Sequence, residues 1–394
     1  MKIMHIDHNY HYCGGTEQYL LSIIDMLEKR GHQQVVVYSN KTERTVSKES
    51  CREYHLPGVT MELNLRQIPA LSRIIKEESP DIIYLHNVHN LYALKECLRQ
   101  RPTIRYIHDP SLCCFTHWKL LPGLIDLCDL PLGLSCLRKG CLGLRIKDIL
   151  LYLARMREMR LHKKLGKVIV ASGYMKRLLI QNGFNPSDIE IISYFVTNPP
   201  STSDSVGVGN RGAGAVFYAG IIHKVKGVDI LLKALSFVKT DFKVLLAGQG
   251  EYLEEFKRLS RELGLEEKVE FLGWVANKDL MDYYRRADVV VVPSYWVEAF
   301  GIVGIEAMAC ARPVIGFDTG GISEWLKDGV NGFLVPRGSY RELAEKIELL
   351  LMDKKLNEEM GMAARRLYEE NFTKELHVDK LLSAMENILE VERS

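Results

Sequence analysis

The architecture of this chain can be worked out from residues Glu298–Glu306, whose sequence is EAFGIVGIE. An apolar run, Val289–Val292, precedes this segment, and a second one, Pro313–Phe317, follows it. Short apolar runs of this kind are typical of buried strands, and a glycine often marks the turn into a helix. The pattern therefore predicts a strand, a loop, a helix that begins at the glycine, and another buried strand.

Two carboxylates bracket the point where this loop becomes a helix, since Glu298 lies before the helix and Glu306 lies within it. The N-terminus of a helix offers unbonded N–H groups and the positive end of the helix dipole, so it favours a phosphate. At about 1.5 Å per residue, Glu306 lies roughly 6–8 Å along the helix from its first turn. One ligand can therefore place its phosphates on the amides and a ribose on Glu306, which predicts a site for the donor of a sugar-nucleotide enzyme.

The bulk composition is that of a globular protein with more than one domain. The chain has 394 residues, of which 47% are hydrophobic and 26% charged, and this length favours about two domains. The formal charge of +2 gives no indication of nucleic-acid binding. No apolar run reaches the ~18 residues of a membrane-spanning helix, and the N-terminus reads directly as a strand rather than as a signal peptide. Nine cysteines, an odd number, favour free thiols in a reducing cytoplasm.

The chain begins with a unit of strand, glycine turn, helix and strand. Lys2–Asp7 reads as a buried strand, the pair Gly14-Gly15 ends a polar loop, and apolar residues at helical spacing follow from Thr16. Val35–Tyr38 is the next strand, so the two strands are predicted to be parallel. The glycine pair either allows a ligand to approach the backbone closely or only makes a tight turn, and the sequence leaves both open.

Three further apolar strands of the first half end in polar residues. They are predicted at Asp81–His86, Thr103–His108 and Lys167–Ser172. Ligands of open α/β sheets bind at the carboxyl ends of strands, so these endings are candidates for one wall of a site. A single histidine is more often a hydrogen-bonded structural residue, but we select His108, followed by Asp109, as a candidate functional residue.

An irregular segment, Pro110–Gly143, carries five cysteines, which are Cys113, Cys114, Cys128, Cys136 and Cys141. Thiols at this density are able to hold a zinc ion. No CxxC pair is present, however, so thiols that pack a loop are the favoured interpretation and no metal site is predicted.

A basic amphipathic helix is predicted over Ile146–Lys164. Six of its residues are Lys or Arg, and its apolar residues recur at helical spacing. Such a helix either lies against an anionic membrane surface or packs on its domain with a solvated basic face. Both interpretations remain open.

The segment Thr197–Gly214 (TNPPSTSDSVGVGNRGAG) has the composition of a linker. A second series of alternating strands and helices follows it, as expected for parallel sheets covered on both faces. We therefore predict an α/β protein of two doubly wound, Rossmann-like domains that face a central cleft. The predicted boundaries are residues 1–197 for the first domain, 198–214 for the linker and 215–372 for the second domain, with a final helix over 373–394 that crosses back to the first.

Three loops of the second domain are predicted to surround the phosphates of a ligand. Lys226 lies in a glycine-containing loop after the first strand and offers a point charge to a diphosphate. The residues Phe300–Val303 offer amides, and Gly320-Gly321 follows the next strand. No Asp-x-Asp or similar cluster indicates Mg²⁺, so positive charge for a leaving diphosphate is expected from Lys226 and the helix amides. No cofactor is expected.

The chain resembles retaining glycosyltransferases of family 4, which have the GT-B fold, over nearly its whole length. The glycine-rich loop and first helix of that family resemble GGTEQYLLSIIDMLEKRGHQQVVVYS, and the end of its first domain resembles VIVASGYMKRLLIQNGF. Three segments of the second half match in order and spacing, and they read KGVDILLKAL, ADVVVVPSYWVEAFGIVGIEAMACARPVIG and GGISEWLKDGVNGFLV. Glu298 and Glu306 are then the two acids of the family's E-x7-E motif.

The resemblance implies roles for the residues of the second domain. Glu306 is expected to bind the ribose of the donor nucleotide, and Glu298 to contact sugar hydroxyls and stabilise positive charge at the anomeric carbon. Lys226 is expected to bind the diphosphate. Amides for the sugar and diphosphate are expected from Phe300, Gly301, Ile302 and Val303.

The resemblance also implies roles in the first domain. Gly14 and Gly15 are expected to face the donor phosphates or the acceptor, and His108 occupies the place of a histidine near the transferred sugar. One departure is Ile221, because the family usually has an arginine there that binds the diphosphate. His223 or Lys224 is a candidate to replace that charge. A smaller departure is Ser193-Tyr194-Phe195, where many members have Asn-Gly.

The function predicted is that of a retaining, metal-independent hexosyltransferase. It is expected to move a hexose from a UDP- or GDP-sugar to a glycan or lipid-linked acceptor, in the synthesis of a cell-surface polysaccharide or glycolipid. Peripheral contact with the inner face of an anionic membrane is compatible with the basic helix, and no nucleic-acid partner is expected. Two alternatives remain open, a sugar-nucleotide epimerase of the same fold and a sugar-nucleotide-binding protein with weak catalysis.

Overall fold

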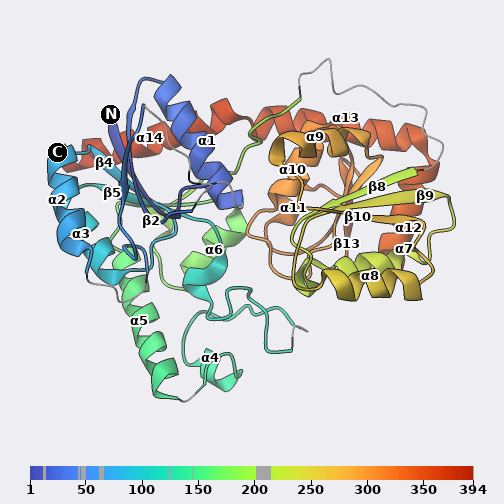
Figure 1. The fold of residues 1–394 in the computed structure, drawn as a ribbon, viewed down its shortest axis with the longest axis horizontal. Helices are drawn as coiled ribbons and strands as arrows, with labels where there is room; N and C mark the ends of the chain where they lie inside the picture. The colour runs from blue at the N-terminus through green and yellow to red at the C-terminus, as the bar shows by residue number, and fades with distance from the viewer. Residues whose placement is uncertain are drawn as a thin grey trace. The chain divides into compact units, whose positions relative to one another are not determined.

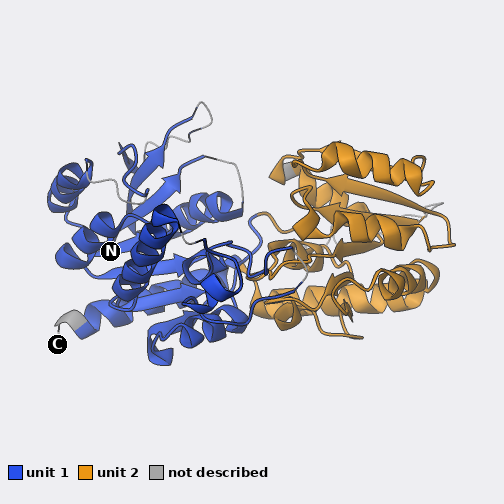
Figure 2. Cartoon of the chain, turned by 90° about the horizontal axis from the view of Figure 1, so that it is seen from below, with its two compact units in different colours: residues 1–197, 374–394 blue, residues 198–373 orange. Residues whose placement is uncertain are grey.

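The computed structural model describes residues 1–11, 15–42, 45, 50–61, 66–123, 126–143, 145–200 and 214–393. The chain forms two compact units, shown in different colours in Figure 2. Unit 1 contains residues 1–197 and 374–394, and unit 2 contains residues 198–373. Each unit is built on one parallel sheet, so the predicted class of two Rossmann-like α/β domains is confirmed. Most of the predicted linker, residues 201–213, lies outside the described residues.

The sheet of unit 1 has seven parallel strands in the order β3-β2-β1-β4-β5-β6-β7. Its central strands consist almost entirely of buried residues, as expected for a sheet covered on both faces. The strands are β1 (Lys2–Asn9), β2 (Gln33–Asn40), β3 (Arg52–His55), β4 (Ile82–Leu85), β5 (Thr103–Ile107), β6 (Lys167–Val170) and β7 (Ile189–Ile191).

Helices cover this sheet in two groups, because the chain leaves β1 toward one edge and leaves β4 toward the other. α1 packs against α14, whereas α2 packs against α3 and α3 against α5 (Figure 1). The helices of unit 1 are α1 (Gly15–Lys29), α2 (Ile68–Glu78), α3 (Leu91–Gln100), α4 (Ser135–Arg138), α5 (Ile146–His162), α6 (Gly173–Gln181) and α14 (Lys374–Arg393).

The C-terminal helix α14 belongs to unit 1, although the residues before it belong to unit 2. Its buried side chains recur at the spacing of one helix face and include Val378, Leu381 and Met385. At its start, His377 donates from Nδ1 to the carbonyl oxygen of Ser193 over 2.7 Å. The helix is therefore a part of the hydrophobic core of unit 1.

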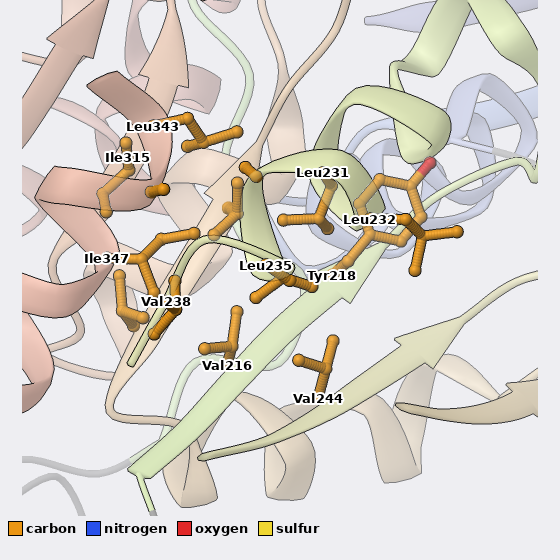
Figure 3. Packing of buried hydrophobic residues seen from close by; sticks show 14 of the residues in the cluster. Val216, Tyr218, Leu231, Leu232, Leu235, Val238, Val244, Ile315, Leu343 and Ile347 are labelled. Atoms are coloured by element: carbon orange, nitrogen blue, oxygen red, sulfur yellow. The ribbon is translucent and has the colours of Figure 1, made fainter. Parts of the chain in front are cut away.

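The sheet of unit 2 has six parallel strands in the order β10-β9-β8-β11-β12-β13. Figure 3 shows its core, in which Val216 and Val244 of the sheet meet Leu231 and Leu235 of α7 and Ile347 of α12. The strands are β8 (Gly214–Ala219), β9 (Phe242–Ala247), β10 (Val269–Gly273), β11 (Val289–Val292), β12 (Val314–Phe317) and β13 (Gly332–Val335).

The helices of unit 2 also lie on both faces of their sheet, with α7, α8 and α12 on one side and α9, α10 and α13 on the other (Figure 1). They are α7 (Val228–Leu235), α8 (Leu253–Glu262), α9 (Asn277–Arg286), α10 (Ile302–Ala309), α11 (Ile322–Trp325), α12 (Tyr340–Met352) and α13 (Lys354–Asn371). Across the described parts of both units, every helix is too short or too polar to span a bilayer.

Candidate active site

The loops after β8 and β11 lie at the point where the strand order of unit 2 reverses. These strands are neighbours, but the chain continues from β8 to β9 in one direction and from β11 to β12 in the other. Ligands of open α/β sheets bind outside the carboxyl ends of strands at such a switch point. Lys226 follows β8 and Glu298 follows β11, so two predicted site residues lie at this place.

The two loops are joined by backbone hydrogen bonds. The N–H groups of Tyr295 and Trp296 both donate to the carbonyl oxygen of Val225, over 2.8 and 3.1 Å. Gly227 has a φ of +69°, and a Cβ atom there would lie 1.9 Å from the carbonyl oxygen of Pro293. A glycine is therefore required beside Lys226 for the loops to approach this closely.

The Glu298 carboxylate accepts three hydrogen bonds on one oxygen. Its Oε1 lies 2.6 Å from Lys226 Nζ, 2.5 Å from Ser294 Oγ and 2.9 Å from Trp296 Nε1. Burial alone would raise the pKa of this carboxyl, but the Lys226 ammonium and the three donors outweigh it, so the pKa of Glu298 is lowered. Glu298 is therefore a buried and ionised group.

Lys226, the predicted diphosphate ligand, is held by this carboxylate. Its ammonium also lies over the Trp296 ring, 4.6 Å from the ring centroid. The side chain keeps 20% of its surface exposed. A ligand phosphate at this position would share the ammonium with Glu298.

Glu306 has a different environment, although it lies on the same segment. Its Oε2 accepts a hydrogen bond of 2.7 Å from the Tyr284 hydroxyl on α9. Burial raises the pKa of Glu306 to about 7, and the bond from Tyr284 opposes this rise only in part. Near neutral pH this carboxyl is therefore only partly ionised.

The first turn of α10 is fixed by the packing of Trp325. Gly301 precedes the helix with a φ of +90°, and the Trp325 Nε1 donates to the carbonyl oxygen of Phe300 over 2.6 Å. A Cβ atom on Gly304 would lie 2.0 Å from the Trp325 ring. The half-buried Ile302 and Val303 form the first turn, whose N–H groups have no acceptor within their own helix.

The loop after β12 closes on the backbone of Glu298. The N–H of Gly321 donates to the Glu298 carbonyl oxygen over 2.8 Å. A Cβ atom on Gly320 would lie 2.1 Å from that oxygen. The glycine pair predicted to close the site therefore fixes the main chain of one acid.

His223 and Lys224, the two candidates to supply the positive charge that Ile221 lacks, both contact the start of α8. His223 accepts at Nδ1 from the N–H of Val225 over 3.2 Å, and its ring packs on Tyr252. Lys224 forms an ion pair of 2.9 Å with Glu255. Ile221 itself is 61% exposed.

In unit 1, polar residues meet at the corresponding switch point between β1 and β4. The buried Asp7 accepts at Oδ1 from the N–H groups of His8 and Asn87, over 2.6 and 3.2 Å. Burial raises the pKa of Asp7 to about 7. Of the predicted glycine pair, Gly15 begins α1 and Gly14 lies outside the described residues.

His108 lies in a buried row of three histidines that crosses β1, β4 and β5. His5 Nδ1 lies 3.4 Å from His86 Nε2, and His86 Nδ1 lies 3.3 Å from His108 Nε2. Burial lowers the pKa of His5 to about 4 and that of His108 to about 3, and it lowers the pKa of His86 well below its usual value. All three imidazoles are therefore neutral at physiological pH.

The ends of this row fix the tautomers of its members. Gln34 donates from Nε2 to the carbonyl oxygen of His32 over 2.9 Å, so its Oε1 accepts from His5 Nε2 over 2.8 Å. Each neutral ring then donates from Nε2 and accepts at Nδ1. At the far end, the Tyr194 hydroxyl donates to His108 Nδ1 over 2.6 Å. Both ring nitrogens of His108, the predicted residue near the sugar, are thus engaged.

The cysteine-rich segment has the character of a packed loop. Lys119, which is almost fully buried, donates to the carbonyl oxygen of Leu130 over 2.6 Å and so joins two parts of the segment. Within the described ranges, no three His, Cys, Asp or Glu side chains gather as a metal ion would require. The five thiols named above are not in disulfide bonds.

Sequence reasoning missed the residues that hold the two acids. Ser294 and Trp296 lie only a few positions before Glu298, so their proximity was available as a signal. Tyr284 lies on the preceding helix, and nothing in the sequence marks it as the partner of Glu306. His5 lies inside an apolar strand and was also missed.

Two family models match the chain in sequence. Residues 13–197 match the model described as Glycosyltransferase Family 4, and residues 209–367 match the model described as Glycosyl transferases group 1. The D-inositol 3-phosphate glycosyltransferase of Mycobacterium sp. (strain KMS) is 34% identical over 192 residues, which are 45% of this chain and 42% of that protein. The protein of the same name from Arthrobacter sp. (strain FB24) is 26% identical over 89% of this chain and 85% of that protein.

A solved structure, Anabaena Alr3699/HepE in complex with UDP and glucose, has the same fold. The TM-score is 0.71 at 21% identity, over 98% of this chain and 100% of that one. The match to the first curated relatives spans less than half of their length. The predicted GT-B fold is confirmed. The chain belongs to the glycosyltransferases, with a Glycosyltransferase Family 4 domain in its first half and a Glycosyl transferases group 1 domain in its second.

Proposed function

We propose that this protein is a retaining glycosyltransferase that moves a hexose from a UDP- or GDP-sugar to a glycan or a lipid-linked acceptor. The observation that carries the proposal is the arrangement at the switch point of unit 2. An ionised, buried Glu298 and the Lys226 ammonium lie 2.6 Å apart, on loops bonded to each other. The segment continues directly into α10, whose first turn presents amides.

The roles we propose follow from the chemistry of these groups. Lys226 and the amides of Phe300–Val303 bind the diphosphate and supply the positive charge that a leaving diphosphate requires, without a catalytic metal ion or cofactor. Glu306 binds the ribose. Glu298, being negative, stabilises positive charge at the anomeric carbon.

The acceptor hydroxyl then attacks the anomeric carbon on the face from which the diphosphate leaves. The C–O bond to the diphosphate breaks as the new glycosidic bond forms, and a phosphate oxygen takes the proton of the hydroxyl. This step needs no protein nucleophile. We propose that Gly14 and Gly15 of unit 1 face the donor phosphates or the acceptor, and that His108 of unit 1 lies near the transferred sugar.

Named relatives support a nucleotide-sugar donor. One solved structure of the same fold holds UDP and glucose, and several relatives are named as glycosyltransferases of an inositol phosphate. We place the reaction on the cytoplasmic side of a membrane, with the protein in peripheral contact with anionic lipid, in the synthesis of a polysaccharide or glycolipid.

One observation favours a second candidate, a sugar-nucleotide-binding protein with weak catalysis. Ile221 is exposed where the family usually has an arginine, and Lys224 is paired with Glu255. If no cation takes the place of that arginine, the leaving diphosphate is less well stabilised and transfer is slow.

The test begins with a thermal-shift screen of UDP- and GDP-sugars, because a bound ligand raises the midpoint of unfolding. With the best donor, Glu306→Ala is expected to weaken binding by about tenfold or more, the effect of losing a hydrogen bond to a charged group. Glu345→Ala, at an exposed position of α12, is the matched control and should bind as the wild type does.

Glu298→Gln separates binding from catalysis. It keeps the size of the side chain and removes its charge, so donor hydrolysis and transfer are expected to fall far more than donor affinity. Unchanged affinity in Glu306→Ala would place the donor elsewhere. Tight binding by the wild type with no turnover would select the weak-catalysis candidate.

A further inference from the structure

The first half of α5 exposes an apolar face to solvent. Ile146 is 78% exposed, Ile149 45%, Leu150 58% and Leu153 44%. These positions follow the spacing i, i+3, i+4, i+7, which places them on one side of the helix. On a helix packed against its domain this side would be buried, so its exposure requires an explanation.

Exposed apolar residues are also frequent in the segment of chain that precedes α5. Just before α4, the helix that precedes α5 in the chain (Figure 1), Leu130 is 40% exposed and Leu134 65%. Six of the large exposed apolar residues of the described chain therefore fall between positions 130 and 153, whereas the others are scattered. We call these six residues the α5 surface; they are Leu130, Leu134, Ile146, Ile149, Leu150 and Leu153.

Positive charge is in excess along α5 and the segment before it, although the exposed Asp126 and Asp129 lie just before Leu130. Asp148 is half-buried and Glu158 is buried, and they are the acidic residues between positions 130 and 164. The exposed basic residues of the same range are Arg138, Lys139, Arg145, Lys147, Arg157, Arg160, Lys163 and Lys164. Because the whole chain carries a formal charge of only +2, this is a strong local excess of positive charge.

The same side of α5 changes from apolar to basic along its length. After Leu150 and Leu153, the positions on that side are Arg157 and Arg160, and the exposed Lys164 follows just beyond the end of the helix at His162. Apolar side chains followed by cations match a lipid surface, where acyl chains lie beneath anionic headgroups. Charge complementarity therefore favours an anionic bilayer over a protein partner.

The second half of α5 anchors the helix to unit 1. Glu158 is buried and accepts from Arg155 over 2.9 Å and from His89 over 2.9 Å. His162 and Met159 are buried on the same half. The exposed first half of α5 therefore extends from a second half that is packed on unit 1.

We propose that the α5 surface docks on a bilayer that contains anionic lipid, with the apolar residues in the interface and the cations on the headgroups. The inference rests on the proposed function in one respect, because docking would bring unit 1 to a lipid-linked acceptor. The lipid contact itself depends on unit 1 alone.

The test is flotation of the full-length protein with vesicles of phosphatidylcholine, with and without phosphatidylglycerol. We expect binding that needs the anionic lipid and weakens as salt is raised. The triple variant Ile149→Ser/Leu150→Ser/Leu153→Ser should lose at least about tenfold in partition coefficient, since it removes three of the six apolar residues of the α5 surface. The matched control, Met352→Ser/Met362→Ser, changes exposed apolar residues of unit 2 and should bind as the wild type does.

A charge variant, Arg157→Gln/Arg160→Gln/Lys164→Gln, should reduce binding and flatten its salt dependence. Nucleotide affinity and the thermal unfolding midpoint of each variant show that it is folded. The proposal would be overturned if the wild-type protein did not bind anionic vesicles. It would also be overturned if the serine and glutamine variants bound these vesicles as tightly as the wild type does. So would a dimer in sedimentation that the serine variant abolishes, since a second copy would then cover this face. Loss of nucleotide binding with intact lipid binding would count against the proposed function only.

Discussion

Two carboxyls of one short segment differ in ionisation because of their hydrogen-bond partners. Glu298 and Glu306 are each 8% exposed, so burial is similar for both. Three donors, one of them the Lys226 ammonium, lower the pKa of Glu298, whereas Tyr284 alone leaves that of Glu306 at about 7. Glu298 is therefore charged without a ligand, whereas Glu306 is only partly charged near neutral pH.

Nucleotide affinity is expected to depend on pH through Glu306. Its pKa in the folded protein is raised to about 7, so below that value the carboxyl carries a proton that a ribose-bound carboxylate must lose. Affinity should be constant above about pH 7 and fall by up to tenfold per pH unit below it. Titration calorimetry across this range measures the slope. In Glu306→Gln the slope should disappear, and an identical slope in both proteins would assign it to another group.

At the scale of the element, the position of α10 depends on a glycine rather than on the acids. Gly304 allows the Trp325 ring to lie against the helix, and that ring in turn holds the carbonyl oxygen of Phe300. The first turn of α10 is therefore positioned by Trp325, which lies outside the segment Glu298–Glu306.

Gly304→Ala should destabilise unit 2 by about 1–3 kcal/mol, since its Cβ would overlap the Trp325 ring. Donor affinity should fall with it, because the first turn of α10 moves. Trp325→Phe removes the atoms that the new methyl group meets. The double variant should consequently lose less than the sum of the single variants, by on the order of 1 kcal/mol in the free energy of unfolding. Strict additivity in urea unfolding would show that the contact does not position the helix.

The elements themselves could largely be predicted from the sequence. Strands such as β11 are continuous apolar runs, and α7 has apolar residues at helical spacing, so both periodicities were readable. β3 was not predicted, because its four residues, Arg-Glu-Tyr-His, contain no apolar run. Element ends shifted by a few residues; α5, for example, ends at His162 rather than at Lys164.

Contacts between elements were beyond the sequence. His5 and His86 are 81 residues apart and meet only because β1 and β4 are neighbours, which the sheet order decides. Lys226 and Glu298 are 72 residues apart, and each was identified, but not their ion pair. Local patterns therefore singled out Lys226 and Glu298, whereas the charge state of Glu298 depends on pairings that only the fold provides.

At the scale of the whole molecule, each unit has its own sheet and hydrophobic core, and α14 joins unit 1 from the far end of the chain. Unfolding should therefore occur in two calorimetric transitions. Leu381→Ala, at a fully buried position of α14, should lower one transition by about 2–5 kcal/mol in stability. The exposed neighbour Lys380→Ala should change it by less than about 0.5 kcal/mol.

A nucleotide sugar should raise the other transition, by about 2.7 kcal/mol at a hundredfold excess over Kd, because Lys226 and Glu306, the residues proposed to bind its diphosphate and ribose, belong to unit 2. Differential scanning calorimetry of the wild type, Leu381→Ala and Lys380→Ala, each with and without the donor, assigns both transitions. The two shifts should be independent, since the substitution and the ligand act on different cores. A single transition moved by both would mean that the units unfold as one, and a donor that shifted the transition lowered by Leu381→Ala would place its binding energy in unit 1.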